Sequence, residues 1–287
     1  MNEPLGTGIL LISCPDRRGL VAGVSDFLFS HGANILHADQ HTDQEEGIFL
    51  QRVEFELDGM DVPPEDVAMA FASVADRFGM RWMHRRSLDR PRVALLVSSE
   101  PHCLWDLLVR WRMGELRGDI ALIVSNHPDH ADAAASFGLP FHHLPVDPES
   151  RPQQELELVS LCEEQRVELV VLARYMQILT STVVDRFPNR IINIHHSFLP
   201  AFTGGRPYHQ AHERGVKVIG ATAHYVTEKL DEGPIIDQDV VRISHRDTVD
   251  DLVEKGRDLE KVVLARAVRL HLDHRVLVYG NKTVVFD

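Results

Sequence analysis

Residues 191–200 read IINIHHSFLP, a strand-length apolar run that ends in polar side chains. Such an ending is unusual because buried polar groups need hydrogen-bond partners. Successive side chains of a strand point to opposite faces, which predicts Asn193 and His195 on one face at the carboxyl end. In open α/β sheets, ligands bind at that end of the strands. The spacing alone leaves open whether this is a catalytic pair or a structural, hydrogen-bonded pair.

Runs rich in Val, Ile and Leu recur on both sides of this segment and alternate with stretches of helical periodicity. Strands are expected at 93–98, 120–125, 169–173 and 191–194, and helices at 103–113, 131–137, 153–165 and 181–187. Buried parallel strands joined by crossover helices produce this alternation, so the pattern predicts an α/β domain with a mostly parallel sheet. A long helix at 248–274 and a hairpin around 279–282 complete it.

The front of the chain follows a different pattern. Strands are expected at 8–13, 33–42, 48–57 and 80–85, and helices at 16–32 and 63–78. The order β-α-β-β-α-β is that of ferredoxin-like domains. The charged stretch that follows ends in Pro91 and has little to bury, which is typical of a linker. We therefore divide the chain into a first domain at 1–85, a linker at 86–91 and a second domain at 92–287.

The composition limits the classes of function. With 287 residues, 44% hydrophobic and 25% charged, the chain has room for two globular domains. A formal net charge of -13 argues against a nucleic-acid partner, because phosphate contacts need clustered Lys and Arg. Cys14, Cys103 and Cys162 form no CxxC pair and indicate neither a disulfide framework nor a thiolate zinc site. The first residues resemble neither a signal peptide nor a membrane span, so a cytoplasmic protein without a membrane partner is expected.

A second polar element lies at 226–236, which reads VTEKLDEGPII. Asp231 stands just before a Gly-Pro turn, and another apolar run follows the turn. Taken alone, such an aspartate is more typical of a turn or a cap than of a catalytic acid.

Together these two segments resemble the folate-dependent formyltransferase family. AFTGGRPYHQA at 201–211, GATAHYV at 220–226 and VLVYGNKTVVF at 276–286 resemble its deformylase branch in particular. The resemblance covers nearly the whole chain, because the front part is similar to ACT regulatory domains. It implies a ferredoxin-like ACT domain followed by a Rossmann-like formyltransferase domain. It also implies hydrolysis of 10-formyltetrahydrofolate to formate and tetrahydrofolate, without a cofactor.

The resemblance assigns roles residue by residue. The catalytic Asn, His and Asp of the family match Asn193, His195 and Asp231. Its folate pocket matches the run 172–179 and the residues just ahead of Asp231. The implied substrate-binding residues are Leu172, Tyr175, Met176, Gln177, Ile178, Leu179, Val226, Thr227 and Glu228. Without the resemblance, plain core or helix packing is the preferred interpretation of the run 172–179.

The chemistry fits these residue types. Attack on a formyl group develops negative charge on its oxygen, and the Asn193 amide with a protonated His195 can donate hydrogen bonds to it. Asp231 can keep His195 charged and oriented, and can accept or relay a proton from the attacking water. The leaving folate nitrogen gains a proton in return. This scheme requires no metal.

Two departures from the transferases favour water as the formyl acceptor. The glycinamide ribonucleotide enzyme of the family holds its substrate phosphate in a Gly-rich loop after the first strand. Residues 97–103, VSSEPHC, contain no glycine, and Glu100 would repel a phosphate. The methionyl-tRNA enzyme has a further C-terminal domain that we do not expect in this shorter, acidic chain. The alternatives are a formyltransferase with an unidentified amine acceptor and a binding regulator without catalysis.

Three more residues are candidates for the pocket. His196 stands where the transferases usually have Pro, and we predict that His196 and Arg206 reshape or close its acceptor side. The alternative is a surface histidine and a structural arginine. His224 lies in the GATAHYV segment and either lines the cleft or is a hydrogen-bonded core histidine.

Two pairs of histidines have spacings that a metal could use, namely His127 with His130 and His209 with His212. In a chain with 17 histidines such pairs are usually surface or loop residues, so no metal site is expected.

The front domain carries two ACT-like signatures, CPDRRGL at 14–20 and GANI at 32–35. In that family, small amino acids bind between paired domains, using helix N-terminal amides. The resemblance therefore implies a homo-oligomer with methionine or glycine as effectors, in an enzyme that balances one-carbon pools and supplies formate for purine synthesis. The expected effector residues are Asp16, Gly19, Leu20, Asn34 and Ile35. A purely structural oligomerisation module is the alternative.

Overall fold

The computed structural model describes residues 5–200 and 207–286, which fall into two units. The first unit comprises residues 1–89 together with 273–279 and 283–287. The second comprises residues 90–272 and 280–282. The boundary after Asp89 lies inside the stretch 86–91, where a linker is predicted.

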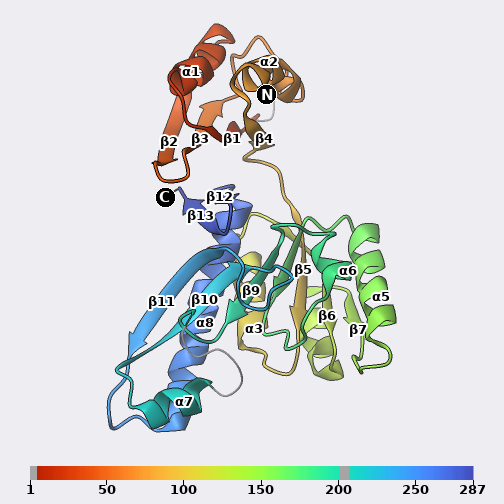
Figure 1. Cartoon of the computed structure of the whole chain (residues 1–287). Coiled ribbons are helices and arrows are strands. Elements are labelled where there is room, and N and C mark those ends of the chain that lie inside the picture. Colours follow the sequence, from red (N-terminus) through yellow and green to blue (C-terminus); the bar gives the residue numbers. More distant parts are fainter. Residues whose placement is uncertain (1–4, 201–206, 287) are drawn as a thin grey trace. The chain divides into compact units, whose positions relative to one another are not determined.

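The first unit has the β-α-β-β-α-β order that the sequence predicts (Figure 1). Its elements are β1 (Thr7–Pro15), α1 (Leu20–Ser30), β2 (Ile35–Asp43), β3 (Ile48–Glu56), α2 (Val67–Phe78) and β4 (Arg81–Arg86). The strands form an antiparallel sheet in the order β2-β3-β1-β4. The ferredoxin-like fold is confirmed.

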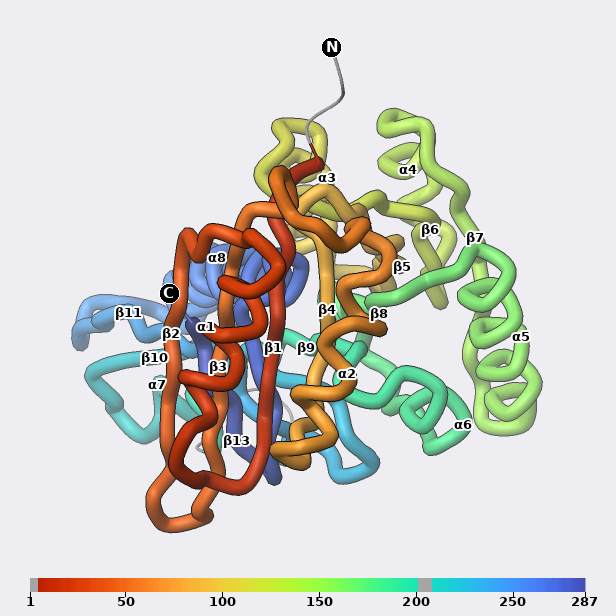
Figure 2. The backbone as a smooth tube through the Cα atoms, turned by 90° about the horizontal axis from the view of Figure 1, so that it is seen from above, coloured from red at the N-terminus to blue at the C-terminus, as the bar shows by residue number. Residues whose placement is uncertain are grey.

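Both helices of the first unit lie on the same face of this sheet, as Figure 2 shows from above. Because side chains alternate along a strand, Leu10 and Ile12 of β1 point to the helices. They pack there against Val24 of α1 and Phe71 of α2, and all four side chains are buried. This core holds the two helices on the sheet.

The opposite face of the same sheet is covered by the C-terminal hairpin, β12 (Val276–Tyr279) and β13 (Lys282–Val285). Phe286 is buried there against Ile9, Leu11 and Leu50. The sequence division placed 273–287 with the second domain, and the structure differs at this point. The physical reason is that β1 is apolar on both faces and that Ile48 and Leu50 of β3 extend its second face, so this face needs a cover.

The second unit alternates strands and helices over most of its length. Its elements are β5 (Arg92–Val97), α3 (His102–Arg112), β6 (Asp119–Ser125), η1 (Pro128–His130), α4 (Ala131–Phe137), β7 (Phe141–His143), α5 (Arg151–Glu164), β8 (Leu169–Leu172), α6 (Ser181–Val184), β9 (Ile191–His195), α7 (Pro207–Arg214), β10 (Val218–Tyr225), β11 (Ile235–Arg242) and α8 (Val249–Leu272).

These strands form one seven-stranded sheet in the order β11-β10-β9-β8-β5-β6-β7. The strands from β7 to β9 are parallel, whereas β10 and β11 add antiparallel strands at one edge. The prediction of a mostly parallel, Rossmann-like sheet is therefore confirmed. The strand order reverses direction between β5 and β8, which is the switch point where open α/β sheets bind ligands.

Helices cover both faces of this sheet. Ala94 and Leu96 of β5 face the core that α5 and α6 complete. Val93 and Leu95 point the other way, to α3 and α8. None of the described helices combines the length and apolar composition that a bilayer crossing requires.

The hairpin's role in the first unit can be tested with Phe286→Ala. Removing a buried aromatic ring leaves a cavity, so the variant should lose about 3–5 kcal/mol of unfolding free energy in the first unit. Denaturant titration with hydrogen exchange on β1 measures this. Phe29→Ala is the matched control, because Phe29 is 83% exposed and its loss should change little. Equal, small effects of both variants would contradict the packing described above.

Candidate active site

A cleft of about 640 Å³ opens at the carboxyl ends of β8 and β9. It lies within the second unit, between the segments 174–179 and 226–231 and the helices α7 and α8. The predicted residues that line it are Leu172, Tyr175, Met176, Gln177, Ile178, Leu179, Asn193, His195, His196, His224, Val226, Thr227, Glu228 and Asp231. Arg206 lies outside the described residues. Residues far apart in sequence therefore meet in one cleft.

His195 and Asp231 lie side by side in this cleft. Nδ1 of His195 lies 3.2 Å from Oδ2 of Asp231, and both side chains are largely shielded from solvent. The hydrogen bond with His195 is the largest reason why the pKa of Asp231 lies well below its usual value. Nε2 of His195 has no hydrogen-bond partner among the described residues and remains for a substrate atom.

Asn193 is oriented by His224, which lies directly opposite it on β10. Nδ1 of His224 lies 2.9 Å from the main-chain oxygen of Tyr225, an atom that only accepts hydrogen bonds. Nδ1 therefore carries a proton, and Nε2 lies 3.2 Å from Nδ2 of Asn193. The same Nε2 lies 3.6 Å from Oδ1 of Asp231. His224 thus contacts both the amide and the carboxylate.

The loop that carries Asp231 is fixed by its backbone. Asp231 has a φ of 57°, in the left-handed region that side chains rarely adopt. A Cβ on Gly233 would lie 1.8 Å from the main-chain oxygen of Tyr225, so only glycine fits there. The amide of Tyr225 donates to the oxygen of Pro234 at 2.9 Å. The Gly-Pro turn therefore brings the loop back against the end of β10.

The loop after β9 is held by a buried hydroxyl, that of Thr222. It donates to the oxygen of Ser197 at 2.9 Å and accepts from the amide of Leu199 at 3.1 Å. Gln238 donates a third hydrogen bond to it at 2.9 Å. We call these three hydrogen bonds the Thr222 clamp. Because Thr222 pairs with His195 across β10 and β9, the clamp fixes residues 197–199, which follow His195 in the chain.

The run 172–179 serves both the core and the cleft. Leu172, Tyr175 and Leu179 are buried members of the second unit's core. Met176 and Ile178 are 55% and 53% exposed and line the cleft. Core packing therefore explains Leu172, Tyr175 and Leu179, whereas Met176 and Ile178 are exposed in the cleft and are available to a ligand. An apolar wall of this kind suits a flat aromatic ligand.

A buried carboxylate that the sequence analysis did not single out lies behind the cleft. Glu260 of α8 is 1% exposed and accepts from His102 Nε2 at 2.8 Å and from the Tyr208 hydroxyl at 2.6 Å. Arg174 Nε lies 3.4 Å from the same carboxylate. Burial alone would raise the pKa of Glu260, but these partners hold it below its usual value. Gly256, one turn earlier, leaves room for the ring of Tyr208.

His196 lies between this cluster and the His195–Asp231 pair. Its ring stacks on that of His195 at 5.2 Å between centroids, and Arg174 donates to its Nδ1. Burial, together with the charge of Arg174, lowers the pKa of His196 to about 4. The ring is therefore neutral at physiological pH, with its proton on Nε2.

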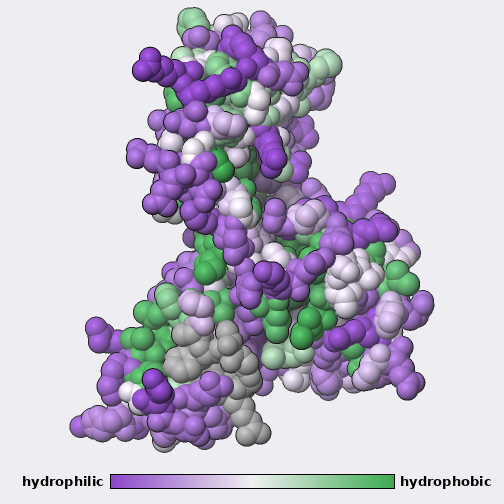
Figure 3. Space-filling model, viewed as in Figure 1, coloured by the Kyte–Doolittle hydropathy of each residue, from purple (hydrophilic) through white to green (hydrophobic). Residues whose placement is uncertain are grey.

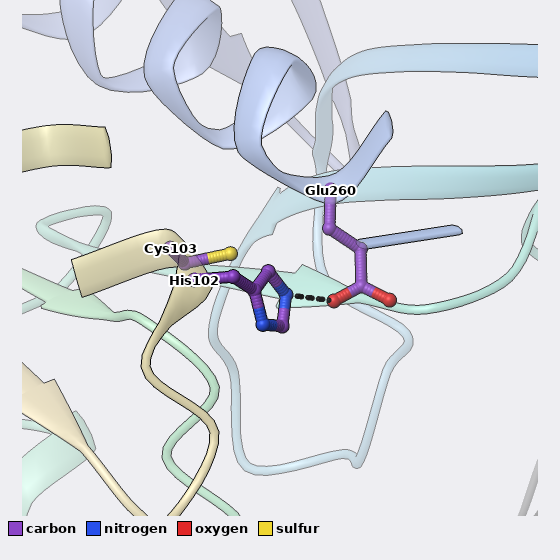
Figure 4. A group of neighbouring side chains, drawn as sticks. All are labelled: His102, Cys103 and Glu260. Atoms are coloured by element: carbon purple, nitrogen blue, oxygen red, sulfur yellow. Dashed lines mark hydrogen bonds and ion pairs between the residues drawn. The ribbon is translucent and has the colours of Figure 1, made fainter. Parts of the chain in front are cut away.

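His102, Cys103 and Glu260 are the described residues whose spacing would suit a metal ion, with ligand atoms within 4.8 Å of one another (Figure 4). The donor set does not fit one. Both carboxylate oxygens already accept hydrogen bonds, and the Arg174 guanidinium lies beside them. Burial raises the pKa of the Cys103 thiol well above its usual value, which disfavours the thiolate that a metal binds. We interpret the cluster as an ion-pair network.

A separate hollow of about 280 Å³ lies next to the cleft. Its lining is almost wholly apolar and includes Phe198, Val218 and Val240. Hydrophobic side chains gather over this β10–β11 side of the second unit in Figure 3. We assign no chemistry to it.

The predicted effector residues do not meet within one chain. Asp16 and Gly19 follow the end of β1, where Pro15 pairs with Ile48. Asn34 and Ile35 lie at the start of β2, where Ile35 pairs with Phe55. Ile48 and Phe55 are seven steps apart along β3, which corresponds to about 23 Å. Leu20, the fifth predicted residue, is buried in the core of the first unit.

Comparison with known protein families assigns each of the two units to a domain family. Residues 91–268 match the family model of the formyl transferases, and residues 8–76 match that of ACT domains. The chain is therefore an ACT domain joined to a formyl transferase domain.

Relatives that match nearly the whole chain narrow the class. The formyltetrahydrofolate deformylase of Synechocystis sp. is 58% identical over 280 residues, which is 98% of each chain. The crystal structure of a formyltetrahydrofolate deformylase from Pseudomonas syringae pv. tomato has a TM-score of 0.96 and 50% identity, and covers 98% of this chain and 94% of that one. Glycinamide ribonucleotide transformylase 1 from Symbiobacterium toebii, with 35% identity and a TM-score of 0.65, covers 69% of this chain and 95% of its own. The chain belongs to the formyltetrahydrofolate deformylase family.

The pairing of Asp231 predicts how stability depends on pH. A carboxyl whose pKa is lower in the folded than in the unfolded chain stabilises the fold above its unfolded pKa, near 3.9. That contribution is lost as the pH falls toward the folded pKa. Wild type should therefore exceed Asp231→Asn in unfolding free energy at neutral pH, and the difference should shrink below about pH 4. Chemical denaturation across this range measures it, and a pH-independent difference would contradict the pairing.

Proposed function

We propose that the chain hydrolyses 10-formyltetrahydrofolate to formate and tetrahydrofolate. The observation that carries the proposal is the His195–Asp231 pair beside Asn193 in a cleft of about 640 Å³. Membership of the deformylase family supports the same reaction. It favours water over an amine as the acceptor, because the deformylases match nearly the whole chain and the transformylase matches 69% of it.

Each polar group has a role in this proposal. The formyl oxygen receives hydrogen bonds from the Asn193 amide and from Nε2 of a protonated His195, which stabilise the negative charge of the tetrahedral adduct. Asp231 stays ionised because its pKa is low, and it stabilises the imidazolium. It also accepts the proton that water loses as the new C–O bond forms. The C–N bond then breaks, the folate nitrogen gains a proton, and formate leaves.

The folate ring system is proposed to bind along the apolar wall formed by Met176 and Ile178. Gln177 and Glu228 offer polar side chains and Val226 an apolar one at the same cleft. No cofactor is needed for this chemistry, because every step moves protons between water, side chains and substrate.

His196 is proposed to close the acceptor side of the cleft together with Arg206, which lies outside the described residues. Its neutral ring, held by Arg174, supports a role in packing and hydrogen bonding rather than in carrying charge. His196→Pro removes this ring, and unchanged hydrolysis in that variant would exclude the role.

Formate release in the absence of an amine tests the central proposal. Asp231→Asn should lower kcat roughly 10²–10⁴-fold, since the imidazolium loses its counter-charge and the water its proton acceptor. Asp132→Asn, at an exposed position on α4, is the control and should match wild type. Absence of formate release from wild type with folate bound would contradict hydrolysis, and full activity of Asp231→Asn would contradict the mechanism.

We further propose that the first unit binds small amino acids such as methionine or glycine between two copies of the chain. The edge strand β2 is exposed along most of its length, and exposed strand edges pair readily with another chain. Antiparallel pairing of two β2 strands would place the start of one, at Ile35, beside the end of the other, at Asp43. That end adjoins the turn at Asp16, so two copies would complete the proposed site.

This arrangement would suit a cytoplasmic homo-oligomer that balances one-carbon pools and supplies formate for purine synthesis. Calorimetry with methionine and with glycine tests it, with sedimentation to measure assembly. We expect binding in wild type and weaker binding in Asn34→Ala, because Asn34 lies at the proposed interface. If neither amino acid binds or alters the rate, regulation by these effectors is excluded.

A further inference from the structure

Among the described residues of the cleft lining, the two arginines, Arg174 and Arg257, each have an acidic partner. Nη2 of Arg257 lies 2.8 Å from Oε2 of Glu100, and both residues line the cleft. Nε of Arg174 lies 3.4 Å from Oε2 of Glu260, which is buried. These two cations and two carboxylates balance in charge.

His102 connects the two pairs. Its Nε2 lies 2.8 Å from Glu260, and its Nδ1 lies 3.8 Å from Glu100. Arg174 continues the sequence of contacts to His196, whose ring stacks on that of His195. A series of side-chain contacts therefore connects the His195–Asp231 pair with the Glu100–Arg257 pair, through His196, Arg174, Glu260 and His102.

We infer that Glu100 is a specificity-determining residue that occupies, with its own carboxylate, the position where an anionic acceptor would bind. This inference rests on the proposed function and names the acceptor class that the site excludes. An arginine pair would attract a phosphate group by charge-assisted hydrogen bonds. With Arg257 held by Glu100 and Arg174 by Glu260, a phosphorylated amine finds both described arginines of the cleft lining already paired with carboxylates.

The Glu100–Arg257 pair is more exposed than the Arg174–Glu260 pair, so Glu100 can be changed with less effect on the fold. Glu260 is 1% exposed and holds three partners, so its loss would disturb the fold. Glu100 and Arg257 are 35% and 47% exposed, and a Gln at position 100 can occupy the same space. Glu100→Gln removes one negative charge, frees Arg257 and leaves the buried network intact.

Inorganic phosphate is the probe, measured by calorimetry without folate and by inhibition of formate release, at ionic strength matched with chloride. Each variant is compared with itself with and without phosphate. Wild type should respond weakly, and Glu100→Gln should bind phosphate about tenfold more tightly, the gain expected from one charge-assisted hydrogen bond. Glu163→Gln is the matched control, because it frees Arg186 from a pair of 2.9 Å outside the cleft lining.

The double variant Glu100→Gln/Arg257→Gln assigns the effect to the pair, because it should return phosphate binding to the wild-type level. The inference is overturned if Glu100→Gln binds phosphate no better than Glu163→Gln, if the double variant keeps the gain, or if wild type already binds phosphate as tightly as Glu100→Gln. Calorimetry needs no turnover. Absence of formate release from wild type would therefore overturn the proposed hydrolysis without deciding this inference.

Discussion

The ion pair between His195 and Asp231 is the constraint on which the rest of the second unit depends. Its two partners come from different elements, the end of β9 and the loop after β10, and they must meet within hydrogen-bond distance. Three local features hold these segments in place. Asp231 adopts a left-handed backbone conformation, Gly233 leaves no room for a side chain, and the Thr222 hydroxyl binds the loop after β9. Catalytic groups that act together must be held to fractions of an ångström, and a rigid sheet with short loops provides this.

Buried charge is costly, and the cleft offsets that cost by pairing. An isolated carboxylate as buried as Glu260 would become protonated, but His102 and Tyr208 donate hydrogen bonds to this one and the Arg174 guanidinium lies beside it. The same pairing sets the character of the site. Asp231 remains ionised, His196 remains neutral, and Arg174 and Arg257 each lie against a carboxylate of the chain. A cleft that holds the Asp231–His195 pair, and whose described arginines Arg174 and Arg257 are paired with carboxylates, suits an uncharged acceptor such as water.

Periodicity predicted most of the fold because the central strands, such as β1, β5, β6 and β8, are apolar runs bounded by polar loops. The period of two placed Asn193 and His195 on one face, and the structure has them so. Glu260 was missed because its partner His102 is 158 residues away, and long-range pairs leave no local pattern. The available signal was a lone glutamate in the buried stripe of α8, between Gly256 and Val263. The hairpin was placed in the wrong unit because its apolar residues fit either core.

Single-turnover reaction in water enriched in oxygen-18 tests the central claim, that water enters the cleft and attacks the formyl carbon beside His195 and Asp231. The account predicts formate that carries one heavy oxygen, released together with an equal amount of tetrahydrofolate and without any added amine. Formate without the label, or release that begins only when an amine is supplied, would contradict it.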